Sequence, residues 1–168
     1  LGEQWGFHVF YQEEYRFEGQ PVSSTRIREA LQLGNFEQVE VLLDRSYSIY
    51  APVCQGEGRG KQLGFPTANF NVSGLCLPPF GVYAIEAYYH SRLIQGIANL
   101  GIAPTVRTDG VPVLEVHLFD FEEELYGQHV EVIFKQFIRS EHKFQHLAEL
   151  RQQIQQDIEA AKQAFAQK

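Results

Sequence analysis

The sequence predicts a mainly β fold: a closed antiparallel β-barrel followed by one α-helix. Several short segments alternate apolar with polar residues, the period-two pattern of a strand that buries one face. Clusters of glycine and proline, such as Gly101–Thr105, separate these segments without helices between them, which favours a closed antiparallel barrel. The expected strands are Tyr47–Cys54, Gly81–Tyr89, Leu93–Leu100, Val113–Phe121 and His129–Ile138.

The end of the chain has a different period. Apolar residues recur every three or four positions, with charged and amide residues between them, which predicts one amphipathic helix packed against the barrel. These apolar positions are Leu147, Leu150, Ile154, Ile158, Ala161 and Phe165.

The residues before the barrel show a third pattern. The apolar and aromatic run Trp5–Tyr11 predicts a strand. The cluster Ser23–Thr25 is suited to cap a helix that ends near Gly34, and Asn35 is suited to cap a second helix. We expect Gln38 to act as the capping-box partner of Asn35.

Two such helices bury too little apolar surface to fold alone. We therefore interpret residues 1–45 as the end of a different domain and residues 46–168 as the barrel domain. The chain starts with Leu1 and contains no methionine, so we expect it to be part of a longer translation product.

The composition is ordinary for a globular protein, with 44% hydrophobic and 21% charged residues. A net charge of −7 counts against general nucleic-acid binding, which normally requires a basic face. The uncharged segment Gln62–Ile85 is long enough to span a bilayer, but its prolines and glycines exclude a membrane helix. We expect neither a membrane nor a nucleic-acid partner.

Cysteine usage favours a cytoplasmic location. Cys54 and Cys76 are the only cysteines, and no CxxC or Cys/His cluster occurs, so a structural zinc site is not expected. The first residues lack the cationic and apolar regions of a signal peptide. A reducing compartment fits both observations.

The densest chemical motif is the glycine-rich segment from Gly56 to Gly64. Alternating glycines let backbone N–H groups approach a phosphate, and Arg59 and Lys61 add positive charge. The spacing matches neither a Walker A motif nor a dinucleotide fingerprint. Taken alone, such a segment is more often a plain turn than a phosphate site.

Thr67 and Asn69 follow this segment two residues apart, so in an extended chain both side chains point to one face. Their hydroxyl and amide oxygens are suited to a hard cation such as Mg²⁺. Because neither ligand is charged, the ion would keep most of its charge for phosphate oxygens. The alternative is a turn closed by side-chain bonds to the backbone, and the residues alone leave both open.

Glu115 and His117 share one face of an expected strand whose other face, beginning at Leu114, must be core. A carboxylate and an imidazole on the outer face of a barrel strand are candidates for a general base. The alternative is an ordinary solvated face. Between the last strand and the helix, Arg139 and Phe144 are suited either to a flat polar ring or to a salt bridge and a core aromatic.

In this order, the motifs resemble the riboflavin kinase family from about Ser46 to Phe165. The resemblance rests on the glycine-rich segment ending in Pro66-Thr67-Ala68-Asn69 and on a series of later motifs. These are Pro78–Tyr83, Asn99–Gly101 with Pro104-Thr105, Leu114–Phe121, Tyr126-Gly127, Ile138–Phe144 and Ile154–Ala160.

This resemblance implies a six-stranded Greek-key barrel with a C-terminal helix, which transfers phosphate from ATP to riboflavin with Mg²⁺ and yields FMN. Thr67 and Asn69 match the magnesium positions, Glu115 matches the catalytic base, and Arg139 and Phe144 match the segment that borders the flavin. The residues that match the ATP loop are Gly56, Gly58, Arg59, Lys61, Pro66, Thr67 and Asn69.

The segment Val22–Arg28 resembles a nucleotide-binding motif of the FMN adenylyltransferase domain, which precedes the kinase in bifunctional bacterial FAD synthetases. That domain's His-x-Gly-His motif is absent here. We expect this chain to act on small molecules without an obligate protein partner, to phosphorylate riboflavin, and not to adenylylate FMN. The alternative is a barrel that binds a flavin or nucleotide without catalysis.

Overall fold

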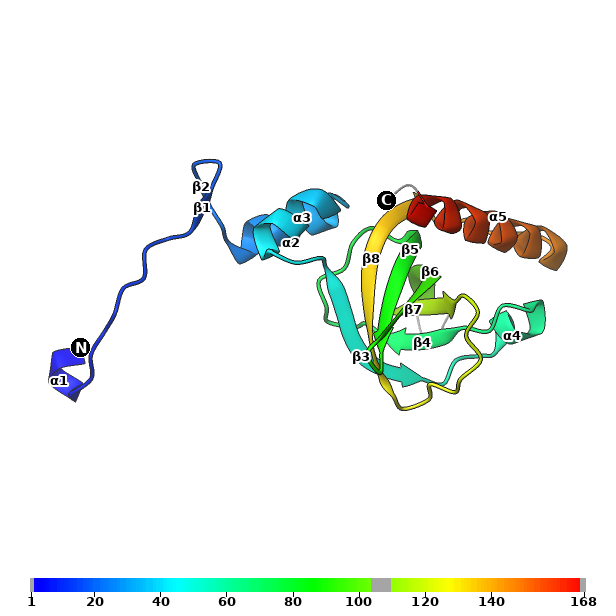
Figure 1. Cartoon of the computed structure of the whole chain (residues 1–168), viewed down its shortest axis with the longest axis horizontal. Coiled ribbons are helices and arrows are strands. Elements are labelled where there is room, and N and C mark those ends of the chain that lie inside the picture. The colour runs from blue at the N-terminus through cyan, green and yellow to red at the C-terminus, as the bar shows by residue number, and fades with distance from the viewer. Residues whose placement is uncertain (1, 104–109, 167–168) are drawn as a thin grey trace.

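A computed structural model describes residues 2–103 and 110–166, which contain a closed six-stranded barrel (Figure 1). The strands are β3 (Ser48–Cys54), β4 (Ala68–Asn71), β5 (Gly81–Tyr89), β6 (Arg92–Ala103), β7 (Val111–Leu118) and β8 (His129–Arg139). They close in the order β3-β4-β7-β6-β5-β8, and every pair is antiparallel.

The connectivity is a Greek key. Strands β5, β6 and β7 follow one another as neighbours, and β8 returns to lie beside β5. This is the spatial order 4-1-2-3 that defines the motif. The fold class expected from the sequence and the resemblance is therefore confirmed.

The expected strand positions agree with the structure, with differences at their ends. β5 has the expected bounds, whereas β7 ends at Leu118 because Asp120 turns the chain at a φ of 52°. Gly101 was expected to break the chain, but β6 continues to Ala103, and Pro104-Thr105 lie outside the described residues. β4 is a strand that the alternation of apolar residues did not single out.

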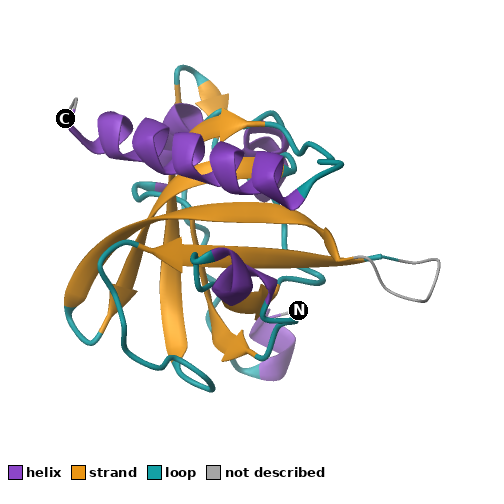
Figure 2. Cartoon of the chain, turned by 90° about the vertical axis from the view of Figure 1, so that its right-hand side faces the viewer, coloured by secondary structure: helices purple, strands orange, loops and turns teal. Residues whose placement is uncertain are grey.

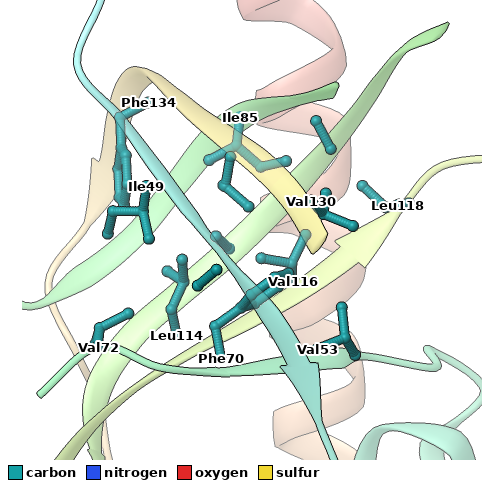
Figure 3. Packing of buried hydrophobic residues seen from close by; sticks show 14 of the residues in the cluster. Ile49, Val53, Phe70, Val72, Ile85, Leu114, Val116, Leu118, Val130 and Phe134 are labelled. Atoms are coloured by element: carbon teal, nitrogen blue, oxygen red, sulfur yellow. The ribbon is translucent and has the colours of Figure 1, made fainter. Parts of the chain in front are cut away.

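The barrel interior is filled by every second residue of the strands. Figure 3 shows Phe70, Val116, Ile85 and Val130 pointing into this core from four different strands. Each is almost inaccessible to solvent, and burying a large apolar side chain contributes about 1.5–3 kcal/mol. The residues between them consequently point to the outside of the barrel.

Helix α5 (Leu147–Ala166) lies across the outside of the barrel (Figures 1 and 2). It contacts β5, β6 and β8, and its residues Ile158 and Ala161 pack on Ala84 and Ile97. The amphipathic helix predicted from the apolar spacing is confirmed. None of the described helices has the length and hydropathy needed to cross a membrane.

The N-terminal segment extends away from the barrel (Figure 1). The prediction of a strand at Trp5–Tyr11 is wrong: α1 (Gly2–Trp5) is a short helix, and Gly6–Tyr15 has no regular structure. A strand requires a neighbour to satisfy its backbone groups, and within the described residues this run pairs with none. In the described part of the N-terminal segment, strand pairing occurs in the small hairpin of β1 (Arg16–Phe17) and β2 (Gln20–Pro21).

Both predicted N-terminal helices are present, as α2 (Ser24–Gln32) and α3 (Phe36–Leu43). The Ser23 and Asn35 side chains cap them, and Asn35 Oδ1 accepts from the Gln38 backbone N–H at 3.1 Å. The Gln38 side chain bonds to the Asn35 amide rather than to its backbone, so only half of the expected capping box forms.

An aromatic contact joins these helices to the barrel. Phe36 stacks on Phe134 at 6.1 Å between ring centroids and meets Tyr83 edge-on at 5.8 Å. Tyr47, just before β3, packs on Phe134 at 5.7 Å. Residues 24–43 thus dock on the barrel core, while the domain boundary at residue 45 stays a prediction.

Candidate active site

The register of the barrel brings three of the predicted site residues, Asn69, Glu115 and Arg139, into one line. Asn69 on β4 lies opposite Glu115 on β7, and Glu115 lies opposite Asn99 on β6. Asn99 in turn faces Val82 on β5, which faces Arg139 on β8. We call these five residues the outer row. Directly paired residues place their Cβ atoms about 4.5–5.5 Å apart on the same face, here the outside of the barrel.

The glycine-rich segment folds onto the first end of the outer row. A Cβ at Gly56 would collide with the Asn69 side chain. A Cβ at Gly60 would collide with the Phe65 carbonyl oxygen and would lie 3.0 Å from Thr67 Oγ1. The loop backbone therefore rests directly against Thr67 and Asn69, and side chains at these two glycines would separate them.

Within this segment the chain forms a one-turn helix, α4 (Arg59–Leu63), that the sequence did not predict (Figure 1). Gly58 and Gly64 flank it with φ angles of 72° and 90°, a left-handed conformation that glycine adopts without strain. Arg59 pairs with Glu57 at 2.6 Å, and both side chains are well exposed. Such a pair contributes little to stability, so the Arg59 guanidinium can exchange this partner for a ligand.

Thr67 and Asn69 present oxygen ligands on the outer face. Both are half-buried, and the Asn69 amide nitrogen donates to the Thr67 carbonyl oxygen at 3.4 Å. That bond uses the nitrogen side of the amide, which leaves Oδ1 as the group available to a cation. The neutral oxygen pair, cradled by Gly56 and Gly60, fits a magnesium ion that is bound together with a nucleotide.

Glu115 lies between the two asparagines of the outer row. Partial removal of water raises the pKa of its carboxyl, the nearby Arg59 lowers it, and the carboxylates of Glu57 and Glu141 raise it. The overall direction is upward. A carboxylate with a raised pKa holds a proton more strongly, which suits a general base.

His117 is the other candidate base on this face, but it is already engaged. Its Nδ1 lies 2.9 Å from the Pro66 carbonyl oxygen, which can only accept, so Nδ1 carries the proton in this contact. Phe65 and Phe119 lie edge-on to its ring at 5.7 and 6.1 Å. His117 thus holds Pro66, and with it the start of β4, against β7.

Arg139 and Phe144 meet at the far end of the outer row. The guanidinium of Arg139 lies 5.8 Å from the centroid of the Phe144 ring. The same guanidinium binds Asp157 of α5 with two bonds, Nε to Oδ1 at 2.8 Å and Nη2 to Oδ2 at 2.7 Å. Asp157 is 3% exposed, and Gln153 donates to it at 3.0 Å. The arginine therefore forms a salt bridge, whereas Phe144 is half-buried and is not a core aromatic, and contact of this pair with a flat ring stays a prediction.

Three residues of this region carried no assigned role from the sequence. Asn99 joins Glu115 through strand register, and no local pattern reports register. The Glu141 carboxylate lies against the backbone of Gly101, where a Cβ would collide with it. Asp157 had a usable signal, because it falls three residues after Ile154 and four before Ala161, on the buried stripe of the helix.

Comparisons with known proteins give the family of the chain. The family described as "Flavokinase: Riboflavin kinase" matches residues 43–165. Two relatives are named bifunctional riboflavin kinase/FMN adenylyltransferase. The protein from Haemophilus influenzae is 40% identical, over 97% of this chain and 53% of its own length. The protein from Bacillus subtilis is also 40% identical, over 86% of this chain and 47% of its own length. The chain spans about half the length of these relatives.

A solved structure titled as a macrolide-efflux protein from Streptococcus pneumoniae has the same fold. It superposes with a TM-score of 0.77 at 30% sequence identity, over 89% of this chain and 49% of that one. The family match includes all six barrel strands and α5 as far as Phe165, and the paired residues of the outer row lie within it. The chain belongs to the riboflavin kinase family.

Proposed function

We propose that this chain transfers the γ-phosphate of ATP to the 5′-hydroxyl of riboflavin, giving FMN and ADP. The observation that carries the proposal is the pairing of Asn69 with Glu115 on adjacent strands. It sets a carboxylate of raised pKa beside the oxygen ligands that the glycine-rich segment cradles. A base next to a phosphate-binding loop is the arrangement that phosphoryl transfer to an alcohol requires.

At the first end of the outer row, the glycine-rich segment binds the ATP phosphates. Backbone N–H groups near Gly56 and Gly58 approach the phosphate oxygens, and Arg59 and Lys61 contribute positive charge. Thr67 and Asn69 hold Mg²⁺, which when bound neutralises charge on the transferring phosphate. In such reactions, positioning and charge stabilisation supply most of the rate enhancement.

At the centre, Glu115 accepts the proton of the riboflavin 5′-hydroxyl as that oxygen bonds to the γ-phosphorus. The bond from this phosphorus to the bridging oxygen breaks, and ADP leaves with the electron pair. At the far end, Arg139 and Phe144 border the isoalloxazine ring, where the guanidinium and the aromatic face match a flat polar heterocycle.

The thiols of Cys54 and Cys76 are unpaired, which suits a cytoplasmic location.

The direct test is to incubate the protein with MgATP and riboflavin and to separate the flavins chromatographically. We expect FMN and ADP in equal amounts, and no FMN when magnesium is chelated. The competing function is a barrel that binds flavin or nucleotide without catalysis. It predicts quenching of riboflavin fluorescence on binding with no ADP, and that result would replace the kinase proposal.

We do not propose FMN adenylylation for this chain, although the longer relatives are named for both reactions. Arg26, in the segment that resembles the adenylyltransferase motif, donates instead to the carbonyl oxygens of Phe17 and Gln20 at 3.2 and 3.5 Å. One arginine of that motif is thus occupied by the β1–β2 hairpin. FAD formed from FMN and ATP by this chain would overturn the expectation.

A further inference from the structure

Asn99 occupies the one polar position of the outer row to which the proposed function assigns no task. It pairs with Glu115 on one side and with Val82 on the other, and its side chain is half-buried. Val82 is apolar and 4% exposed. Between the base and Arg139, the row therefore presents a single amide that can form hydrogen bonds.

The order of residues in the outer row indicates on which side of Glu115 each of the two substrates binds. The glycine-rich segment lies against Thr67 and Asn69, on the β4 side of Glu115. Phosphoryl transfer places the attacking and leaving oxygens roughly in line. If the nucleotide occupies the β4 side, the alcohol approaches from the opposite side, which is β6 and Asn99.

The distance from Glu115 to Arg139 also supports binding of the flavin on the β6 side of Glu115. Asn99, Val82 and Arg139 lie on three successive strands, β6, β5 and β8. Neighbouring strands are spaced about 4.8 Å apart, so Glu115 and Arg139 are separated by roughly 14 Å along the barrel surface. A substrate whose reacting hydroxyl lies at Glu115 and whose chain runs toward Arg139 meets Asn99 first, because the next position, Val82, is buried.

We propose that Asn99 binds the internal hydroxyl groups of the riboflavin side chain and so positions the terminal hydroxyl at Glu115. This inference rests on the proposed function and adds a substrate-positioning residue to it. An amide offers two donors and one acceptor, which matches hydroxyls on successive carbons. The Glu141 carboxylate, against Gly101 two residues further along β6, borders the same stretch.

The test compares two substrates. One is riboflavin, and the other is a flavin with a 5-hydroxypentyl chain, which keeps the terminal hydroxyl and lacks the internal ones. For Asn99→Ala, we expect the KM for riboflavin to rise about three- to tenfold, the effect of losing one or two neutral hydrogen bonds. We expect no change in the KM for ATP and no change in the KM for the hydroxypentyl flavin.

Asn99→Thr is the second variant, because threonine favours a strand and lacks the amide. Gln95→Ala is the matched control: Gln95 is exposed on the same strand and face, four residues from Asn99, and its backbone bonds remain. We expect this control to match the wild type with both flavins. The wild-type protein alone should bind riboflavin more tightly than the hydroxypentyl flavin.

The outcomes separate the two proposals. FMN formation with equal losses on both flavins in the Asn99 variants would assign Asn99 a structural role and overturn the inference while the kinase function stands. Equal wild-type affinity for both flavins would overturn it as well, without any variant. Absence of FMN formation by the wild-type protein would overturn the kinase function and this inference together.

Discussion

The two ends of the outer row are built in opposite ways. At the Asn69 end, the polar side chains of Thr67 and Asn69 are uncharged, the glycine-rich loop lies close against them, and the cation Arg59 is exposed. At the Arg139 end, a guanidinium is already fixed by two bonds to a buried aspartate and lies against an aromatic ring. One end is open and adaptable, and the other is organised before any ligand binds.

The proposed function explains this difference by the groups that it assigns to each end. A triphosphate with magnesium brings its own charges, so the protein needs space, backbone donors and neutral oxygen ligands. A flavin ring is neutral, and its recognition requires a rigid surface that is fully satisfied before binding. Substitutions at the Asn69 end should therefore change kinetics, and those at the Arg139 end should also change stability.

The largest expected effect is at the centre, between the two ends. Glu115→Gln removes the proposed proton acceptor and keeps the size of the side chain, so we expect kcat to fall by about 10²–10⁴-fold. Binding of ATP and riboflavin should persist, as measured by fluorescence quenching and calorimetry. Near-normal FMN formation would mean that Glu115 is not the base and would make His117 the next candidate.

The next effect tests the open end. Gly60→Ala drives a methyl group toward the Phe65 carbonyl oxygen and Thr67, which should displace the loop and lower kcat/KM for ATP by about 10–100-fold. Because alanine favours a helix and Gly60 lies in α4, a loss of activity cannot be attributed to a weakened helix.

The control for this substitution is Gly74→Asn. Gly74 has a φ of 79° and open space around it, and asparagine tolerates this conformation. We expect kcat/KM to stay within about twofold of the wild type for this control. Equal losses in Gly60→Ala and Gly74→Asn would show that the kinetics do not depend on the approach of the loop to Thr67.

Substitution at the Arg139 end of the outer row should lower the stability of the protein. Asp157→Asn removes the charge that Arg139 binds, and we expect the free energy of unfolding to fall by about 1.5–3 kcal/mol. The exposed pair of Arg92 with Glu123 is the control, and Glu123→Gln should cost no more than about 0.5 kcal/mol. Urea denaturation measures both, and equal costs would contradict a preorganised end.

The smallest expected effect is at Tyr47, which lies at neither end of the outer row, and it changes stability without changing catalysis. The Tyr47 hydroxyl donates to the Cys76 carbonyl oxygen, and burial, with a smaller contribution from Cys76, raises the pKa of Tyr47 to about 12. An unfolded tyrosine ionises near about pH 10, so this contribution is complete below that pH and is lost as the pH rises to about 12.

Tyr47→Phe should therefore weaken the loss of stability between about pH 10 and 12, and at pH 8 it should cost about 0.5–1.5 kcal/mol. Urea denaturation as a function of pH provides the measurement, and kcat should be unchanged. Burial also raises the pKa of Tyr83, so part of the alkaline loss should persist in the variant. An unchanged alkaline profile would contradict the role of Tyr47.

Local patterns were sufficient for most of the fold. Alternation of apolar residues located five of the six barrel strands, and the three- and four-residue spacing located α5, because each pattern follows from which face is buried. The run Trp5–Tyr11 has a strand composition without a strand, since a strand also needs a partner. Composition reports the preference of a segment and says nothing about its neighbours.

By itself, the sequence determined the barrel, its closing helix, both N-terminal caps and the motifs that place the chain among riboflavin kinases. Only the tertiary structure decided that Asn69, Glu115 and Asn99 lie side by side, and that Asp157 holds Arg139. The physical reason is register. A slip of one residue would turn every side chain of a strand to the other face, and contacts between distant segments choose the register.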